Sequence, residues 1–208
     1  MLLDHEECQL VLVDYQERLM PALIDGPATL GQAVRLARMA ALLQMPVFAT
    51  EQNPAKLGQN MPELQTALVE ARARTLAKMS FSACPDGLVD WLRPPQRPAG
   101  GGGNARSLPR HLQKAAPPPA QAQRNSIVIA GCEAHVCLLQ TALDLLEQEF
   151  EVWVVTDACS ARTERSRDAA FDRLAGNGAE LVTTEMVCFE WLRSAEHPLF
   201  RQLHALIK

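Results

Sequence analysis

Residues 126–146 read SIVIAGCEAHVCLLQTALDLL, and the rest of the chain is organised around this stretch. Its first six residues form an apolar run, a polar link follows, and the apolar segment after the link is too long for a strand but suits a helix. The pattern predicts a strand, a sharp elbow and a helix, with Cys137 in the first helical turn. Unpaired backbone N–H groups and the helix dipole at such a position lower the pKa of a thiol and favour the nucleophilic thiolate. An equally open interpretation is that Cys137 is a small buried hydrophobic residue.

Strand and helix patterns alternate along the remaining chain. Expected strands cover 9–13, 47–50, 75–77, 126–131, 151–156 and 179–183, and expected helices cover 30–44, 62–69, 82–92, 136–146, 163–175, 186–194 and 198–207. Thr29 is the expected N-cap of the first helix, and 51–60 is expected to be a loop. This alternation predicts an α/β fold: a doubly wound, mostly parallel six-stranded sheet with helices on both faces, in a three-layer, Rossmann-like arrangement.

A single domain over residues 1–208 is expected, interrupted by one unusual segment. Residues 94–124 hold seven prolines and four consecutive glycines, with almost no large apolar residues. Such a composition cannot build a packed core, so the sequence predicts a flexible, low-complexity surface insertion.

The composition is that of a globular protein without a broad basic surface. The 208 residues carry a net charge of −4 at pH 7 and are 48% hydrophobic, which argues against disorder and against a nucleic-acid partner. No apolar run approaches the length of a membrane span, and the acidic N-terminus lacks a secretory signal pattern. Six cysteines without a C-x-x-C pair indicate free thiols rather than a zinc site. We therefore expect a cytoplasmic protein without a membrane partner.

Three polar residues follow the first, third and fourth expected strands: Asp14, Lys78 and Cys137. Periodicity does not fix the strand order, but in the common order 3-2-1-4-5-6 strands one and four are neighbours where ligands bind, outside the carboxyl ends of the strands. A thiol nucleophile needs a base and a group that holds this base in its working charge state. Asp14 can accept the thiol proton, and Lys78 can stabilise the carboxylate and the thiolate. Taken singly, a strand-end Asp is often a turn residue and a loop Lys is usually solvated.

Residues around the elbow complete the predicted site. Backbone N–H groups between Glu133 and Cys137 are suited to a developing oxyanion. His135 is a rival base, but residues two apart on a helix do not face each other, so it is given a minor substrate-lining role. Candidates to line the substrate pocket, which are equally open to a packing role, are Tyr15, Leu19, Gln52, Phe81 and His135.

On these residues the chain resembles the isochorismatase-like cysteine hydrolases. That family carries an Asp after the first strand, a Lys after the third, and a Cys in a G-x-x-x-x-x-C elbow after the fourth. Here the matching segments are VDYQ at 13–16, AK at 77–78, GCEAHVC at 131–137 and the later run VTDACS at 155–160. The local patterns TEQ at 50–52, K-x-x-F-S at 78–82 and G-x-E-A at 131–134 resemble most closely the isochorismatase-domain-containing branch.

The resemblance implies a doubly wound sheet, often assembled as a homo-oligomer. It implies an Asp14–Lys78–Cys137 triad, a thioester intermediate with an amide substrate, and a cis peptide at Cys132–Glu133 that orients the Glu133 and Cys137 amides into an oxyanion hole. Nicotinamidases of the family bind a metal through an Asp-x-His motif, whereas residues 50–54 hold no His, so neither a metal nor another cofactor is expected. Isochorismatases proper lack the nucleophilic Cys, so Cys137 favours acyl transfer.

Three functional hypotheses follow. The first is a cysteine-dependent, metal-independent hydrolase of a small amide or related acyl compound, acting through a thioester on Cys137. The second is a non-catalytic binding or scaffold protein that keeps the fold and uses the insertion or an oligomer face. The third is a redox-responsive thiol protein, because Cys132 and Cys137 lie five residues apart.

Overall fold

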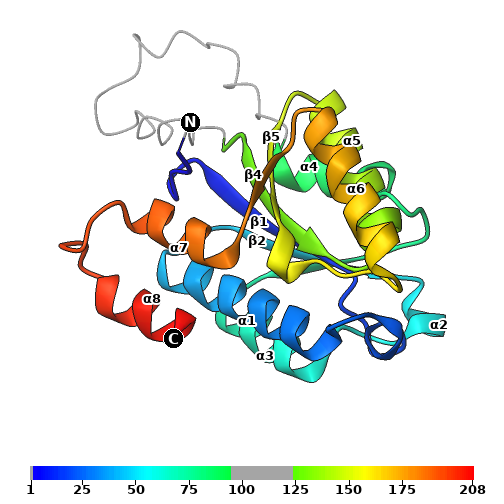
Figure 1. Ribbon diagram of the computed structural model, residues 1–208, viewed down its shortest axis with the longest axis horizontal. Helices are drawn as coiled ribbons and strands as arrows, with labels where there is room; N and C mark the ends of the chain where they lie inside the picture. Colours follow the sequence, from blue (N-terminus) through cyan, green and yellow to red (C-terminus); the bar gives the residue numbers. More distant parts are fainter. Residues whose placement is uncertain (1, 95–123) are drawn as a thin grey trace, which may run out of the picture.

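The computed structural model describes residues 2–94 and 124–208, so the predicted insertion at 94–124 falls almost entirely outside the described residues. Six strands form one sheet in the order β3-β2-β1-β4-β5-β6, and every neighbouring pair is parallel (Figure 1). The strands are β1 (Cys8–Val13), β2 (Val47–Gln52), β3 (Arg74–Lys78), β4 (Ser126–Gly131), β5 (Glu151–Val155) and β6 (Glu180–Val182). The predicted fold class is confirmed, and β1 and β4 are neighbours.

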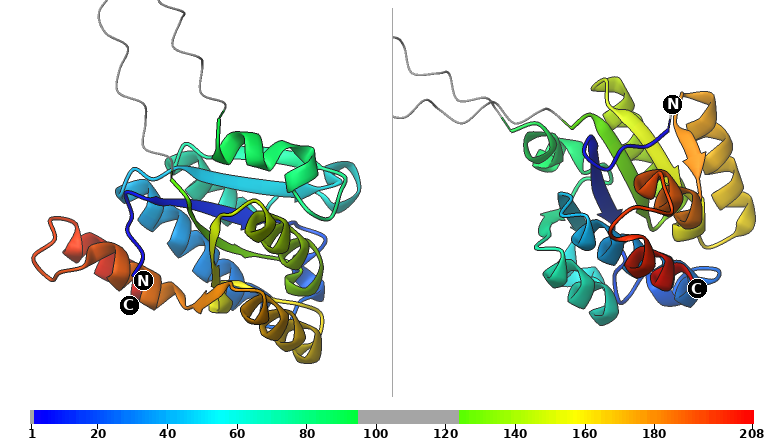
Figure 2. Two further views of the ribbon diagram at one scale, coloured as in Figure 1. Left: turned by 90° about the horizontal axis from the view of Figure 1, so that it is seen from above. Right: turned by 90° about the vertical axis from the view of Figure 1, so that its left-hand side faces the viewer.

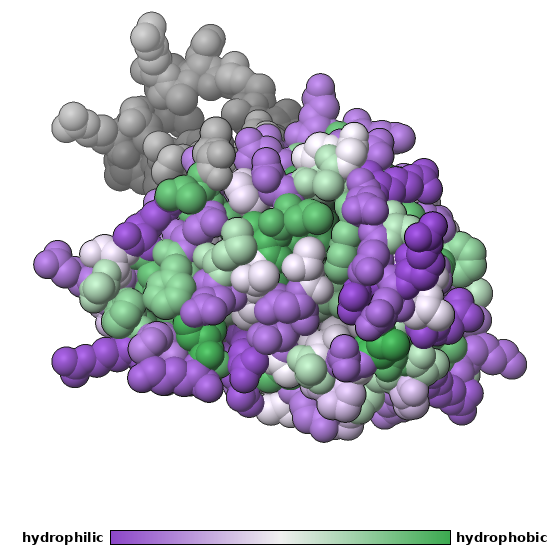
Figure 3. All heavy atoms as spheres, in the orientation of Figure 1, coloured by the Kyte–Doolittle hydropathy of each residue, from purple (hydrophilic) through white to green (hydrophobic). Residues whose placement is uncertain are grey.

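Helices cover both faces of this sheet. One face carries α1 (Gly26–Leu42), α3 (Pro62–Glu70), α7 (Thr184–Leu192) and α8 (Phe200–Ile207), and the other carries α4 (Val89–Leu92), α5 (Leu139–Glu147) and α6 (Glu164–Gly176) (Figures 1 and 2). The short α2 (Pro54–Leu57) follows β2. Hydrophilic residues are spread over the outward surfaces of the helices on the face drawn in Figure 3. Among the described residues, no helix is both long and apolar enough to cross a membrane.

The two central strands hold the core. Every residue of β1 and of β4 is buried, because helices cover both faces of a parallel sheet and leave no side of a central strand in water. Their near-continuous apolar sequences follow from this position. The pairing register places Val13 beside Gly131, so the end of β1 lies directly against the start of the elbow.

Several predicted boundaries were wrong for local reasons. The helix α1 begins at Gly26, not at 30, because Pro27 fits the first turn, where its missing N–H is not needed. Thr29 is therefore buried inside the helix and is not its N-cap. The strand β2 extends through Gln52 and α2 occupies part of the expected 51–60 loop. The expected 82–92 helix is broken, since Gly87 has a φ of 106° between a π-helical turn at Cys84–Leu88 and α4.

Gly131 is required by the close approach of β1 and β4. A Cβ at this position would lie 2.5 Å from the Val13 Cβ and 2.6 Å from the Val13 carbonyl oxygen. Overpacking costs about 1–3 kcal/mol, and backbone atoms yield less than side chains, so we expect Gly131→Ala to lower the free energy of unfolding by about 3 kcal/mol. Gly31→Ala is the control, since a Cβ on that helical glycine meets nothing within 4 Å. Urea denaturation measures the free energy of unfolding of both variants. If Gly131→Ala unfolded at the same urea concentration as the unaltered protein, this close packing of β1 and β4 would be contradicted.

Candidate active site

Asp14 is the first residue beyond β1, and its backbone places its carboxylate under the elbow. Its φ of 57° lies in the left-handed region, which Asp tolerates better than most residues. The side chain is fully buried, and one carboxylate oxygen, Oδ1, accepts a hydrogen bond of 2.6 Å from the Thr50 hydroxyl of β2. The second oxygen, Oδ2, therefore faces the remaining groups of the site.

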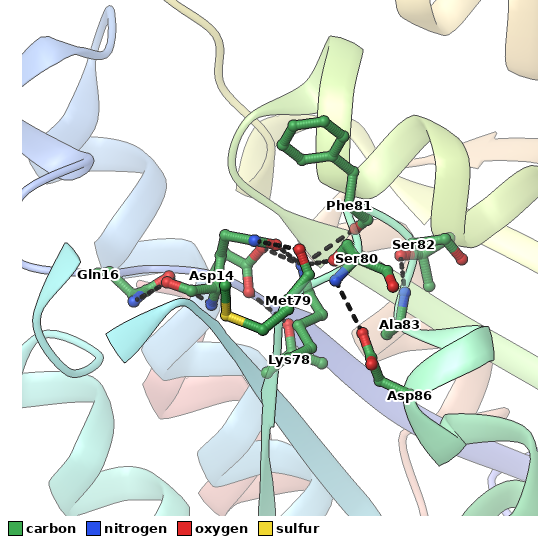
Figure 4. A network of polar contacts seen from close by, with 12 residues as sticks. Asp14, Gln16, Lys78, Met79, Ser80, Phe81, Ser82, Ala83 and Asp86 are labelled. Atoms are coloured by element: carbon green, nitrogen blue, oxygen red, sulfur yellow. Dashed lines mark hydrogen bonds and ion pairs between the residues drawn. The ribbon is translucent and has the colours of Figure 1, made fainter. Parts of the chain in front are cut away.

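Lys78 ends β3 and forms the buried partner of Asp14. Its Nζ lies 2.8 Å from Asp14 Oδ2, and neither side chain is exposed. The ammonium also donates to Gln52 Oε1 at 2.7 Å and to the carbonyl oxygens of Phe81 at 3.0 Å and Ser80 at 3.3 Å. Figure 4 shows Asp14 and Lys78 side by side, reached from different strands of the sheet. All three protons of the ammonium are thus engaged by protein acceptors, which fixes the position of this charge.

The loop after Lys78 is fastened to neighbouring helices. The Ser80 N–H donates to Asp86 Oδ2 at 2.9 Å, as Figure 4 shows. The Ser82 hydroxyl donates to Asp144 Oδ2 at 2.5 Å and so connects this loop to α5. Because the carbonyls that hold the ammonium of Lys78 belong to this loop, its anchoring also holds the ammonium in place.

Cys137 lies above this ion pair. The elbow forms a π-helical turn, Ala134–Leu138, that leads into α5, so the thiol does not lie in a regular first turn as predicted. Its thiol is close enough to Asp14 and Lys78 for the charges of both to act on its pKa, and the residue is only 5% exposed. Apart from the ammonium of Lys78, the buried Asp14 Oδ2 has no hydrogen-bond partner among the described groups. The carboxylate therefore has an acceptor free for the thiol proton.

The charge state of this thiol differs from the prediction. The pKa of Cys137 is raised to about 12, first by burial and then by the negative charge of Asp14, and the positive charge of Lys78 only partly offsets both. The expectation of a lowered pKa was therefore wrong, because desolvation and a nearby carboxylate outweigh the helix end. In the resting protein Cys137 is a neutral thiol beside a base.

The elbow itself is held by the loop after β5. The peptide bond Cys132–Glu133 is cis, and the Ala134 N–H donates to the Ser160 carbonyl oxygen at 2.7 Å. The Glu133 carboxylate is 2.5 Å from the Arg162 Nε. These contacts place the backbone of the elbow beside the thiol, where the resemblance locates the oxyanion hole.

The residues predicted to line the pocket differ in burial and in their contacts. Tyr15 is fully buried and donates from its hydroxyl to the Ala158 carbonyl oxygen at 2.5 Å, so it is a core residue and its predicted pocket-lining role was wrong. Gln52 is 8% exposed and engaged with Lys78. Leu19 is half-buried, and Phe81 is 55% exposed, with its ring turned away from the ion pair in Figure 4. His135 is half-buried, and its Nδ1 has no hydrogen-bond partner among the described residues.

Two residues that the sequence reasoning left out belong to the site. Thr50 supports Asp14, and Gln16 is fully buried and hydrogen-bonded to the backbone of Gln52. Both lie in the motifs VDYQ and TEQ, so their polar character at the ends of buried strands was the available signal.

The other cysteines, all within the described residues, form no disulfide with Cys137. All six cysteines are free thiols. Cys132 is fully buried against the Met20 sulfur at 3.8 Å, and burial raises the pKa of its thiol well above the ordinary value. Within residues 2–94 and 124–208, no group of three or more His, Cys, Asp or Glu side chains is arranged to hold a metal ion.

The fold and this site together define a three-layer α/β protein with a buried carboxylate, ammonium and thiol at the carboxyl ends of its central strands. A model of the isochorismatase domain matches residues 119–186. Isochorismatase domain-containing protein 2A of Mus musculus is 33% identical over 203 residues, which cover 98% of this chain and 84% of that protein. Isochorismatase domain-containing protein 2 of Homo sapiens is 34% identical over 199 residues, covering 96% and 82%. The chain therefore belongs to the isochorismatase-like hydrolase family.

Solved structures of the same fold agree with this assignment. The MAR1 ribonuclease of Caenorhabditis elegans superposes with a TM-score of 0.82 at 28% identity, covering 100% of this chain and 92% of that one. The YcaC gene product of Escherichia coli, described as an octameric hydrolase of unknown specificity, gives a TM-score of 0.78 at 23% identity, with coverage of 100% and 89%. The expected resemblance is confirmed.

Proposed function

We propose that this protein is a cysteine-dependent, metal-independent hydrolase that acts on a C–N bond of a small amide, or on a related acyl compound, through a thioester on Cys137. The observation that carries the proposal is the placement of one thiol near both members of a buried ion pair, Asp14 and Lys78, which lie 2.8 Å apart and both act on the pKa of Cys137. Buried charges are costly unless paired, so such a pair beneath a thiol favours a chemical role over chance packing.

The proposed first step converts the neutral thiol directly into a thioester. Asp14 Oδ2 takes the thiol proton as the Cys137 sulfur attacks the substrate carbonyl carbon, and the oxyanion is held by the backbone amides of Glu133 and Cys137. The tetrahedral intermediate collapses, the C–N bond breaks, and the protonated Asp14 gives its proton to the leaving amine. Lys78 stabilises the negative charge of Asp14 or of the sulfur as the proton moves.

The second step returns the enzyme to its starting state. Asp14 takes a proton from a water molecule, the resulting hydroxide adds to the thioester, and collapse releases the carboxylic acid. The sulfur leaves as a thiol after Asp14 returns the proton. The same carboxylate thus serves as base and acid in both halves of the reaction, which requires it to remain beside the sulfur.

Replacement of the nucleophile tests this proposal. We expect Cys137→Ala to lower the hydrolysis of small amides or of p-nitrophenyl acetate by about 10³-fold or more, since loss of a covalent nucleophile removes most of the catalysis. Cys84→Ala is the matched control, because Cys84 is also a free, partly buried thiol. Equal rates for Cys137→Ala and the unaltered protein would overturn the proposal.

We also propose that the protein is cytoplasmic. We propose in addition that it forms a homo-oligomer, since the Escherichia coli structural neighbour is an octamer. Light scattering coupled to size-exclusion chromatography measures the assembly directly. A non-catalytic binding role that uses the insertion remains the alternative. It predicts that deleting residues 95–123 removes partner binding while turnover is absent from the unaltered protein.

A further inference from the structure

Gln52 is held by protein groups at both ends of its side-chain amide. Its side-chain oxygen accepts the Lys78 ammonium at 2.7 Å, and its side-chain Nε2 donates to the Met79 carbonyl oxygen at 2.8 Å. The two contacts need an acceptor at one end and a donor at the other, so they fix which way the amide is turned. The amide of Gln52 therefore has a role within the protein, in addition to the predicted substrate-lining role.

The backbone of Gln52 is fixed as well. Its N–H donates to Gln16 Oε1 at 2.7 Å, and its carbonyl oxygen accepts from Gln16 Nε2 at 2.9 Å. Gln16 is fully buried and its Nε2 also donates to the Gly58 carbonyl oxygen at 2.7 Å. A buried network in which each group has its partner is rigid, so this one holds the side chain of Gln52 at a set distance from Lys78.

The chemical type of this side chain matters as much as its position. Around the Lys78 ammonium, the protein supplies one carboxylate, from Asp14, and otherwise only neutral acceptors: Gln52 and the carbonyls of Ser80 and Phe81. A second carboxylate in place of the Gln52 amide would accept the same proton, but its negative charge would weaken the effect of the Lys78 ammonium on neighbouring groups. One of these groups is the thiol of Cys137, because the positive charge of Lys78 lowers its pKa and partly offsets burial and Asp14.

We infer that Gln52 is a positioning residue that holds the Lys78 ammonium between Asp14 and Cys137 with a neutral acceptor, so that the positive charge stays available to the sulfur. The inference rests on the proposed cysteine-dependent function and adds a residue to its mechanism. Gln52 acts through Lys78 and contacts neither the sulfur nor the substrate in this role.

Iodoacetamide labelling of Cys137 tests the inference without a known substrate. Peptide mass spectrometry separates this thiol from the other five, and the labelling rate is followed across about pH 7 to 10. Gln52→Glu keeps the shape and the hydrogen bond to Lys78 but adds a negative charge. We expect its labelling at Cys137 to slow by about tenfold, the effect of one unit of thiol pKa. Gln52→Met removes the acceptor, frees the ammonium to move, and should also slow labelling.

Matched variants separate the possible outcomes. Gln44→Glu adds the same charge beyond the opposite end of β2 and should leave Cys137 labelling unchanged. Lys78→Met should slow labelling more than Gln52→Glu does. If Lys78→Met slows labelling while folded Gln52→Glu and Gln52→Met match the unaltered protein across the pH range, the role of Gln52 is overturned and the triad stands. If Lys78→Met has no effect, Lys78 does not act on the sulfur, and both the triad and this inference fail.

Discussion

Asp14→Asn should change the turnover and the alkylation of Cys137 in opposite directions. Removing the general base should lower hydrolysis by about 10²–10⁴-fold. The carboxylate of Asp14 is also one of the groups that raise the pKa of the Cys137 thiol, while Lys78 lowers it. Without the carboxylate the pKa falls, the thiolate fraction at a given pH rises, and iodoacetamide labelling becomes faster. A more reactive thiol in a less active enzyme is the signature of proton transfer during the reaction.

In the unaltered protein the thiol of Cys137 is almost fully protonated at neutral pH. With a pKa of about 12, only about one Cys137 in 10⁵ is ionised at pH 7. The labelling rate of the unaltered protein should therefore still be rising at about pH 10. A labelling curve that levels off below about pH 8 would contradict a neutral resting thiol.

Asp25→Asn is the matched control for Asp14→Asn. Asp25 is exposed and also has a left-handed backbone, with a φ of 50° against 57° for Asp14. The same exchange at that position should leave both turnover and Cys137 labelling unchanged. If Asp14→Asn kept full activity with a folded protein, Asp14 would not be the base.

Lys78→Met should be the most destabilising single change at the site. The variant leaves the fully buried Asp14 carboxylate without its partner, which costs about 3–5 kcal/mol in comparable buried pairs. It should also raise the pKa of Cys137, because the positive charge of Lys78, which lowers this pKa, is lost. Chemical denaturation measures the free energy of unfolding, and we expect turnover to be lost in the protein that remains folded.

The double variant Asp14→Asn/Lys78→Met separates charge from packing. It removes both buried charges, so it should be more stable than Lys78→Met while remaining inactive. Arg38→Met is the control, since the ion pair of Arg38 with Glu70, at 3.3 Å, is nearly half exposed and should contribute only about 0–1 kcal/mol. If Lys78→Met lowered the free energy of unfolding by no more than Arg38→Met does, the buried ion pair of Asp14 and Lys78 would be contradicted.

The fold could be predicted because its strongest signals are local. The apolar runs of β1 and β4 reflect strands buried on both faces, and the alternation with helices then leaves few topologies open. Asp14 and Lys78 could be identified for a related reason: each lies at the carboxyl end of a strand, an edge that parallel strands share.

What could not be predicted depends on contacts between segments far apart in the chain. The pKa of Cys137 follows from burial and from Asp14, 123 positions away by the numbering (137 minus 14), whereas the local sequence around Cys137 indicates only a helix end. Gln52 was expected to line the pocket or to pack, and its contacts with Lys78 and Met79 could not be predicted, because they join β2 to the end of β3 and the loop after it. Nothing in the sequence around Tyr15 indicates that its hydroxyl donates a hydrogen bond to the carbonyl oxygen of Ala158.

Acyl-adduct mapping tests the central claim most directly. The protein is mixed with p-nitrophenyl acetate, or with an amide that it is found to hydrolyse, and the reaction is quenched in acid during turnover. The protein is then digested for peptide mass spectrometry, and Cys137→Ala is treated in the same way. We expect an acyl group on Cys137 that accumulates before steady state, and neither adduct nor turnover in Cys137→Ala. Turnover that continues in Cys137→Ala, or an adduct found only on another residue, would contradict the central claim.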